Sequence, residues 1–301
     1  MWLQNSAFRQ QLATHTARPL YSNFKQSYMK TIFITGASAG LGKATAQLFQ
    51  SKGWQVIATM RNPEKETELN QLHNVVLLPL NVTDALQIGQ TIKFAIENYD
   101  IDIVFNNAGY GLVGALESYT DEQILQQIDT NLTGCIRVIK AFIPHFKAKK
   151  NGLFITTTSV CGFSSNPLSS VYNATKWALE GFSESMSYDL AQFNIGIKTV
   201  APGGIKSNFI NGMQAVVDVD YEGLNQRLGE LFSDGTLIEF TPAPQIAEVV
   251  YEAATDGKDQ LRYLAGNDAI KTYLQRLELG AENFRRNLTA LFNLESPFKN
   301  N

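Results

Sequence analysis

The chain has 301 residues, of which 44% are hydrophobic and 18% are charged, and its net charge is -3. This length allows one large α/β domain or two small ones, with enough residues for a sizeable core. The slightly acidic balance argues against nucleic-acid binding, which needs a concentrated basic face, and no apolar stretch approaches the roughly 18 residues of a membrane span.

Cysteine and histidine are scarce in this sequence. The two cysteines, Cys135 and Cys161, lie inside well-patterned segments, so we expect no disulfide framework and a reducing compartment, the cytoplasm. The three histidines are too scattered for a metal site, and we expect none. Proton chemistry is therefore expected to use another residue type.

The first 29 residues differ from the rest. They contain no Asp or Glu but carry Arg9, Arg18 and Lys25. A basic, acid-free leader is typical of an organelle transit peptide. The absence of a helical apolar pattern favours a flexible N-terminal extension over residues 1–29 instead, with the folded domain over 30–301.

From residue 30 onward, short apolar runs alternate with helix-length segments. We predict strands at Lys30–Thr35, Gln55–Thr59, Val75–Leu80, Ile101–Phe105, Leu153–Thr157, Ile195–Val200 and Leu261–Leu264. We predict helices at Leu41–Lys52, Asp84–Asn98, Glu122–Lys149 and Tyr172–Phe193. Continuously apolar strands that alternate with helices indicate βαβ crossovers. The sequence thus predicts an α/β fold, a doubly wound parallel sheet (Rossmann fold) in a single domain.

Three glycines, Gly36, Gly40 and Gly42, follow the first predicted strand and open the first helix. Glycines at this position allow a tight turn and a close approach of the backbone to a pyrophosphate at the helix N-terminus. We therefore expect a dinucleotide site here; the alternative is a structural turn that binds nothing.

The second predicted strand is followed by Arg61, with no carboxylate before Glu64. An acidic residue at this point accepts hydrogen bonds from a ribose 2′-hydroxyl, whereas an arginine accommodates a 2′-phosphate. NADP(H) is favoured over NAD(H), unless Arg61 only solvates a loop.

A tyrosine and a lysine, Tyr172 and Lys176, lie four residues apart on a predicted helix and so share a face. The apolar stripe of this helix runs through Ala174, Ala178, Phe182, Met186 and Leu190. We expect the Tyr/Lys pair to point away from that buried stripe.

Four further motifs accompany this pair. Ser159 follows the strand Leu153–Thr157, Asn106-Asn107-Ala108-Gly109 ends the strand Ile101–Phe105, Asn131 lies in the long helix, and Pro202-Gly203-Gly204-Ile205 follows the strand Ile195–Val200. With these motifs in this order, the sequence resembles the short-chain dehydrogenase/reductase family, in its core branch with a Tyr-x-x-x-Lys active site. The resemblance covers about residues 30–265.

The resemblance implies a catalytic tetrad of Asn131, Ser159, Tyr172 and Lys176. Tyr172 is then the general acid in carbonyl reduction and the general base in alcohol oxidation, with its pKa lowered by the ammonium of Lys176 together with the positive charge of an oxidised nicotinamide. Lys176 also holds the nicotinamide ribose, Ser159 orients the substrate oxygen, and the helix backbone at Asn131 holds a water in a proton relay.

The resemblance also implies the cofactor contacts. They are Gly36, Ser38, Gly40, Leu41, Gly42, Asn107, Gly109, Tyr172, Lys176, Pro202, Gly203 and Ile205. Two residues depart from the family pattern: Asn81, before Val82, replaces the usual Asp near the adenine, and Ser207 replaces Thr after the Pro-Gly turn. We expect both positions to keep their contacts.

In the family the substrate lid lies at about residues 206–240 of this chain. Its apolar residues are Phe209, Met213, Val216, Val217, Leu224, Leu228, Leu231 and Phe232. They suit a lipophilic carbonyl or alcohol, or else they pack the lid's own helix onto the body. A C-terminal amphipathic helix is predicted over 267–294, and the helices Glu122–Lys149 and Tyr172–Phe193 form the expected interface of a homodimer or homotetramer.

These features together predict an oxidoreductase that transfers a hydride between NADP(H) and a small-molecule carbonyl or alcohol, acting on CH-OH groups. The alternatives are an NAD-dependent alcohol dehydrogenase of the same fold and a dinucleotide-sensing protein without catalysis.

Overall fold

The computed structural model describes residues 29–207, 209 and 212–295. The predicted N-terminal extension therefore lies outside the described residues, apart from Met29. The described chain contains a seven-stranded sheet in the order β11-β7-β6-β4-β1-β2-β3, and all neighbouring strands are parallel. The strands are β1 (Thr31–Thr35), β2 (Gln55–Met60), β3 (Val75–Pro79), β4 (Ile103–Asn106), β6 (Gly152–Thr157), β7 (Ile195–Pro202) and β11 (Arg262–Ala265). The predicted doubly wound parallel sheet in a single domain is confirmed.

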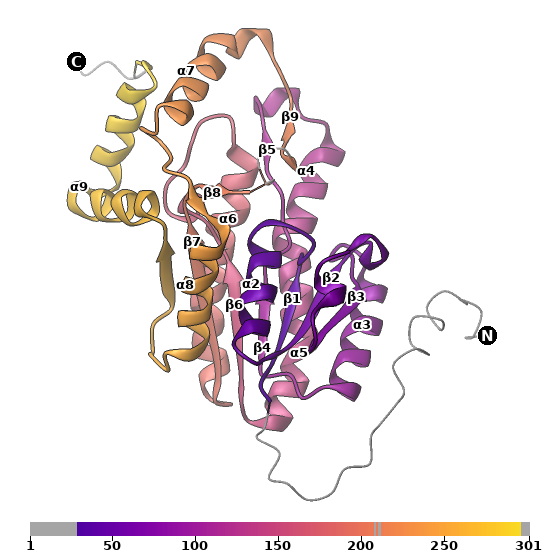
Figure 1. Cartoon of the computed structure of the whole chain (residues 1–301). Coiled ribbons are helices and arrows are strands. Elements are labelled where there is room, and N and C mark those ends of the chain that lie inside the picture. Colours follow the sequence, from indigo (N-terminus) through magenta and orange to yellow (C-terminus); the bar gives the residue numbers. More distant parts are fainter. Residues whose placement is uncertain (1–28, 208, 210–211, 296–301) are drawn as a thin grey trace, which may run out of the picture.

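Helices cover both faces of this sheet (Figure 1). The helices α2 (Gly40–Ser51) and α8 (Ala243–Thr255) pack on one face, where their apolar residues join Ile32 and Ile34 of β1. The helices α3 (Ala85–Asn98), α5 (Gly134–Lys149) and α6 (Ser170–Ala191) pack on the other face. Phe33 faces that second layer, because successive strand residues point to opposite faces.

The order of the strands places a ligand site at one edge of the sheet. The chain runs from β1 outward to β3 and then returns to β4 on the other side of β1. At such a topological switch point the loops after the two central strands diverge and leave a crevice at the carboxyl ends. The residues that follow β1 and β4 therefore border the same crevice.

The predicted long helix Glu122–Lys149 is interrupted. It consists of α4 (Asp121–Ile128), a π-helical segment (Asp129–Thr133) and α5. The helix α4 begins with a capping box between Thr120 and Gln123. A π segment widens the helix locally, because its backbone hydrogen bonds join residues five apart instead of four. Such segments are frequent at functional sites. Asn131 lies inside this segment.

The expectation about the buried face of α6 is wrong. Ala174 is exposed and Ala178 is half-buried, whereas Tyr172, Lys176 and Glu180 are buried. The apolar spacing could not show this, because the polar face of α6 packs against other polar groups brought by β6, β7 and β11. Phe182, Met186 and Leu190 join the second helical layer as expected.

The segment predicted as a lid is held by two small parallel sheets. The strand β8 (Ile205–Lys206) pairs with β10 (Thr241–Pro242), and β9 (Gln214–Ala215) pairs with β5 (Leu112–Val113), which follows β4. Between them lies α7 (Glu222–Ser233), whose Leu228 and Leu231 pack in a cluster with Ala115, Leu168 and Phe292. These two leucines therefore fix the lid helix to the body rather than line the crevice.

The C-terminal helix α9 (Asn267–Leu291) follows β11 directly. It is kinked at Gly280, whose φ of 73° and ψ of 160° are not helical. The chain also forms short 3-10 turns at Pro63–Lys65, Leu69–Gln71, Leu116–Ser118, Val160–Gly162 (η5) and Val219–Tyr221. Within the described residues, no helix combines the length and the apolar character needed to cross a bilayer.

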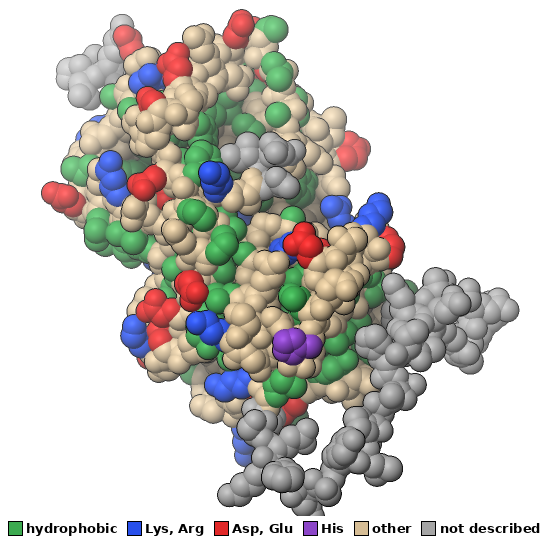
Figure 2. All heavy atoms as spheres, in the orientation of Figure 1, with side chains coloured by type: hydrophobic (Ala, Val, Ile, Leu, Met, Phe, Trp, Pro, Cys, Tyr) green, Lys and Arg blue, Asp and Glu red, His purple; other side chains and the backbone are tan. Residues whose placement is uncertain are grey.

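Figure 2 shows the molecule from the side of α2 and α8. On this face, basic and acidic side chains are interspersed and form no extended patch of one sign.

Candidate active site

The glycine turn after β1 forms a tightly packed cradle. Gly36 has a φ of +68°, and a Cβ there would lie 2.8 Å from the Cα of Ala108. A Cβ at Gly42 would lie 2.3 Å from the carbonyl oxygen of Gly36. Gly40, with a φ of +55°, approaches Ser207. No larger residue fits at Gly36 or Gly42, so the turn is specified by close packing.

The cradle fits an anionic group. The helix α2 begins at Gly40 after Ala39, which provides no side-chain cap, and Ser38 and Ala39 are exposed. The amides of the first turn of a helix have no partners within the helix, and they attract anions such as a pyrophosphate. The neighbouring loop is fixed by Asn107, whose amide donates to the carbonyl oxygens of Thr35 and Gly36 at 3.2 and 3.1 Å.

The residues predicted at the adenosine end follow the next two strands. Arg61 comes directly after β2 and is exposed. Asn81 follows β3, and its side-chain oxygen accepts hydrogen bonds from the amide and hydroxyl of Thr83 at 3.2 and 2.9 Å. Val82 is buried against Gly134, where a Cβ would lie 2.8 Å from the Val82 carbonyl oxygen. Arg61 and Asn81 therefore lie at the ends of neighbouring parallel strands.

Asn131 connects the interrupted helix to the loop after β4. Its side-chain oxygen accepts from the amide of Tyr110 at 3.0 Å, and its side-chain nitrogen donates to the carbonyl of Tyr110 at 2.9 Å. A Cβ at Gly109 would lie 3.1 Å from the same oxygen. The Asn131 side chain therefore positions the loop after β4. In the predicted proton relay, the water would be held by the backbone of the π segment.

Ser159 and Tyr172 lie next to each other at the end of β6. Ser159 caps η5, and its hydroxyl accepts from the amide of Cys161 at 3.1 Å. The hydroxyl of Ser159 also lowers the pKa of Tyr172. Burial and the thiol of Cys161 act in the opposite direction, and burial is the larger effect. The pKa of Tyr172 is therefore raised above its ordinary value.

Lys176 lies one helical turn after Tyr172 and is buried. Its ammonium donates to the carbonyl oxygen of Thr157 at 2.9 Å and lies 5.8 Å from the centre of the Tyr172 ring. Burial lowers the pKa of Lys176 to about 8, against the opposing effect of Cys135, Cys161 and Glu180. Burial dominates the pKa of Tyr172 and the ammonium of Lys176 bonds to the backbone of β6, so Lys176 alone does not lower that pKa. The joint effect of Lys176 and an oxidised nicotinamide stays a prediction.

The turn after β7 depends on a residue that the sequence reasoning did not include. The backbone amide of Gly204 donates to the carboxylate of Asp268 at 2.7 Å, and a Cβ at Gly203 would lie 2.0 Å from that carboxylate. Pro202 ends β7, and Ile205 begins β8. Asp268 lies 64 residues from Gly204, so neither spacing nor motif could have identified it.

Two lid residues lie over this site. The ring of Phe209 lies 6.4 Å from the ring of Tyr172, centre to centre, and Met213 packs against Gly111, where a Cβ would come within 2.8 Å of its Cε. Ser207 accepts from the amide of Phe209 at 3.3 Å. These contacts give the tyrosine side of the site an apolar wall.

Two further buried polar residues were missed. Both side-chain polar atoms of Asn106, at the end of β4, lack a partner in the described part of the chain. Glu180 lies one turn after Lys176 and pairs with Arg262. Asn106 was part of the quoted Asn-Asn-Ala-Gly motif but was given no role, and Glu180 carried no signal apart from its spacing of four from Lys176.

Comparison with known proteins agrees with this geometry. The family model of the short chain dehydrogenases matches residues 30–216. An uncharacterized oxidoreductase of Schizosaccharomyces pombe is 35% identical over 214 residues, which cover 70% of this chain and 90% of that protein. Human retinol dehydrogenase 8 is 34% identical over 215 residues, 68% of each chain.

A solved structure supports the same assignment. A short-chain dehydrogenase from Streptomyces avermitilis is 27% identical, with a TM-score of 0.76 over 89% of this chain and 97% of that one. The glycine cradle, the Ser159 turn and the Tyr172–Lys176 pair thus lie on a shared fold. The chain belongs to the short-chain dehydrogenase/reductase family of oxidoreductases.

Proposed function

We propose that this protein transfers a hydride between NADP(H) and a lipophilic carbonyl or alcohol, with Tyr172 as the general acid or base. The observation that carries the proposal is the grouping of two hydroxyls and one ammonium. Ser159 lies close enough to Tyr172 to lower its pKa, and Lys176 lies one turn further along the same buried face.

A nicotinamide dinucleotide supplies the hydride in reduction and accepts it in oxidation. The cradle residues Gly36, Ser38, Gly40, Leu41 and Gly42 would hold its pyrophosphate at the N-terminus of α2. Arg61 would hold a 2′-phosphate through charge-assisted hydrogen bonds, because its guanidinium is exposed directly after β2. The remaining contacts assigned to the dinucleotide are Asn81, Val82, Asn107, Gly109, Tyr172, Lys176, Pro202, Gly203, Ile205 and Ser207.

The two hydroxyls would act together on the substrate oxygen. Ser159 and Tyr172 donate hydrogen bonds to it and orient it, and Tyr172 delivers the proton in reduction. Burial keeps the phenol protonated at neutral pH, so Tyr172 is a proton donor, as reduction requires. Lys176, whose pKa is lowered to about 8, would then return a proton through a water held by the backbone of the π segment at Asn131.

The substrate class follows from the wall beside Tyr172. Phe209 and Met213 present apolar side chains there. Retinol dehydrogenase 8, named for a lipophilic alcohol, is among the relatives with about one third identity. These observations favour a lipophilic substrate over a small, charged one.

We also propose that the protein acts in the cytoplasm as a homodimer or homotetramer. The helix α6 leaves Trp177 and Tyr188 exposed, at 41% and 71% of their surface. Large aromatic side chains are enriched at protein interfaces. Sedimentation of the purified full chain would show a dimer or tetramer, and a monomer at all concentrations would exclude this arrangement.

The experiment that tests the function is a screen of aldehydes, ketones and alcohols with NADPH, NADH and their oxidised forms, followed by nicotinamide absorbance. We expect turnover of an apolar carbonyl compound with NADPH. Binding of NADPH without turnover of any compound would support the sensing alternative, and a preference for NADH would contradict the assignment of Arg61.

A further inference from the structure

The buried carboxylate of Glu180 lies one helical turn after Lys176 on α6, and it is 4% exposed. A buried charge costs free energy unless it is paired and hydrogen-bonded. Removing one partner of such a pair is strongly destabilising. The position of Glu180 beside the catalytic lysine therefore calls for a functional explanation.

We propose that Glu180 is a positioning residue of the catalytic centre, which with Arg262 fixes Lys176 and the Ser159 turn and connects both to the C-terminal helix α9. The expected effect of Glu180 on turnover rests on the proposed function. The expected effect of Glu180 on the titration of Lys176 does not.

The first part of the argument is the ion pair. One oxygen of Glu180 contacts Arg262 of β11 at 2.8 and 2.9 Å and accepts from the hydroxyl of Thr199 on β7 at 3.3 Å. The other oxygen lacks a hydrogen-bond partner in the described part of the chain. Glu180 thus ties α6 to two strands of the sheet through a single oxygen.

The second part is the contact with the Ser159 turn. Gly162 ends η5, and a Cβ there would lie 3.0 Å from Cγ of Glu180 and 3.1 Å from the carbonyl oxygen of Lys176. The turn that Ser159 caps is therefore seated on the segment of α6 that contains both Lys176 and Glu180. A shift of the Glu180 side chain would therefore displace the turn that Ser159 caps.

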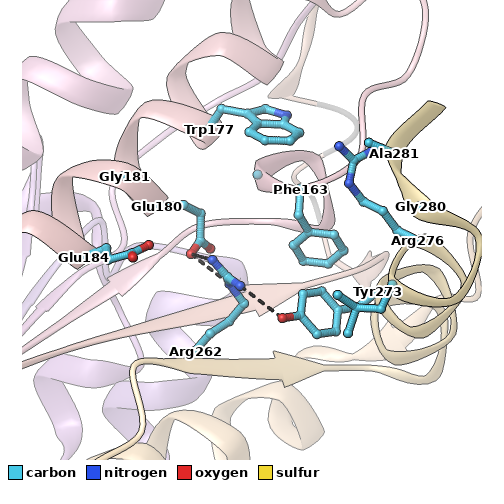
Figure 3. Close-up of a pocket in the computed structure, with 12 residues that line it drawn as sticks. Phe163, Trp177, Glu180, Gly181, Glu184, Arg262, Tyr273, Arg276, Gly280 and Ala281 are labelled. Atoms are coloured by element: carbon cyan, nitrogen blue, oxygen red, sulfur yellow. Dashed lines mark hydrogen bonds and ion pairs between the residues drawn. The ribbon is translucent and has the colours of Figure 1, made fainter. Parts of the chain in front are cut away.

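The third part is the connection to α9, which Figure 3 shows. Arg262 donates to the hydroxyl of Tyr273 on α9 at 3.4 Å, and its guanidinium lies 5.6 Å from the centre of that ring. The Tyr273 ring meets Phe163, the residue after Gly162, at 5.1 Å with an edge-on geometry. The ion pair, α9 and the Ser159 turn thus form one continuous set of contacts.

A cavity of about 580 Å³ borders this set of contacts. Glu180, Arg262 and Tyr273 line it together with Trp177 of α6 and Arg276 of α9 (Figure 3). Because Glu180→Gln keeps the side-chain volume and Arg262 borders the cavity, these substitutions can be accommodated without overpacking. This makes the pair accessible to substitution experiments.

The fourth part is electrostatic. The groups that face Lys176 are Tyr172 and Glu180 from α6, Cys135 from α5, Cys161 from η5 and the carbonyl oxygen of Thr157 from β6. Glu180 is the carboxylate among them, and it raises the pKa of Lys176 against the effect of burial. Arg262 partly neutralises this carboxylate. Changes at Glu180 and at Arg262 should therefore move the pKa of Lys176 in opposite directions.

The test uses four variants of the full chain: Glu180→Gln, Arg262→Gln, the double variant and Glu184→Gln. Glu184 is the matched control, because it is an exposed glutamate one turn further along α6 that lines the same cavity. The titration of the Lys176 amine is followed by NMR in protein labelled with ¹⁵N-lysine and assigned with Lys176→Met. Turnover, its pH profile and the melting temperature are measured in parallel.

We expect Glu180→Gln to lower the pKa of Lys176 by about one unit and Arg262→Gln to raise it, with the double variant between them. Each single variant should lower kcat by roughly tenfold or more, with KM for NADPH changed less, and Glu184→Gln should behave as the unmodified chain. The double variant should recover the melting temperature, because neither amide leaves a buried charge.

An unchanged Lys176 titration in both single variants would overturn the inference, whatever happens to stability. Loss of melting temperature with unchanged kcat and pH profile would assign Glu180 a structural role only and would also overturn it. Absence of turnover in the unmodified chain would contradict the proposed function, while the NMR titration would still decide the role of Glu180.

Discussion

The ammonium of Lys176 donates a hydrogen bond to the carbonyl oxygen of Thr157 at 2.9 Å. This contact anchors the helix α6 to the end of β6, the strand that leads into Ser159. Tyr172 precedes Lys176 by one turn and lies next to Ser159. One hydrogen bond thus connects the helix of Tyr172 and Lys176 to the strand that leads into Ser159, three of the four proposed catalytic residues.

The lowered pKa of Lys176, about 8 against 10.5 for a free lysine, has a consequence for stability. Below pH 8 the amine is protonated in both states, and burial of its charge costs the folded state. Between pH 8 and 10.5 the unfolded chain binds the proton and the folded chain does not, so stability rises with pH in this window. Lys176→Met removes the effect. Relative to that variant, the free energy of unfolding of the unmodified chain should rise by about 3 kcal/mol across the window.

Denaturant unfolding of both chains at several pH values measures this difference. A constant difference between them from pH 7 to 10.5 would show that Lys176 titrates at its ordinary pKa.

Arg61 should decide between the two dinucleotides. Arg61→Ala is expected to lower kcat/KM with NADPH by about 10- to 100-fold and to leave the value with NADH nearly unchanged, because only the 2′-phosphate loses a charge-assisted partner. Lys65 is an exposed cation in the same loop, and Lys65→Ala serves as the control. Equal losses with both dinucleotides would show that Arg61 does not contact a 2′-phosphate.

Gly36 should be intolerant of any side chain. Gly36→Ala combines a positive φ with a contact of 2.8 Å to the backbone of Ala108. Gly53 provides the control, because its φ is +82° and nothing lies within 4 Å of its Cβ position. Gly53→Ala should cost about 1 kcal/mol from the backbone conformation alone. Gly36→Ala should cost about 1–3 kcal/mol more and should also weaken NADPH binding. Similar unfolding free energies for the two variants would show that close packing at Gly36 does not contribute to stability.

Asp268 should support dinucleotide binding indirectly, because it fixes the turn after β7. Asp268→Ala leaves the buried amide of Gly204 without its acceptor, which is expected to cost about 1–3 kcal/mol of stability and to raise KM for NADPH. The exposed neighbour Asn267 bonds to Glu239, and Asn267→Ala should change neither quantity. An unchanged KM for NADPH in Asp268→Ala would show that this carboxylate does not support dinucleotide binding.

The sequence predicted the sheet because it depends on local patterns, whereas the tetrad came from the family resemblance and stays a prediction. Continuously apolar runs identify buried parallel strands, and the residues that follow such strands must meet at one edge of the sheet. The positions of Gly36, Ser159 and Tyr172 follow from these two facts together with the family motifs.

What the sequence could not show depends on contacts between distant segments. The burial of the polar face of α6 requires Arg262, which lies 82 residues from Glu180, and the turn at Gly204 requires Asp268. The π segment at Asn131 spans only Asp129–Thr133 within a run predicted as one helix, so the apolar pattern did not reveal it. The raised pKa of Tyr172 is likewise a result of burial, which spacing along a helix does not determine.

The most direct test of the central claim is a single-turnover measurement with Tyr172→Phe. This change removes only the hydroxyl oxygen and keeps the ring, so the variant should bind NADPH with nearly unchanged affinity. Hydride transfer to the best carbonyl substrate should be at least about 100-fold slower than in the unmodified chain. If the variant instead transfers the hydride at the unmodified rate, Tyr172 is not the proton donor and the proposed mechanism is wrong.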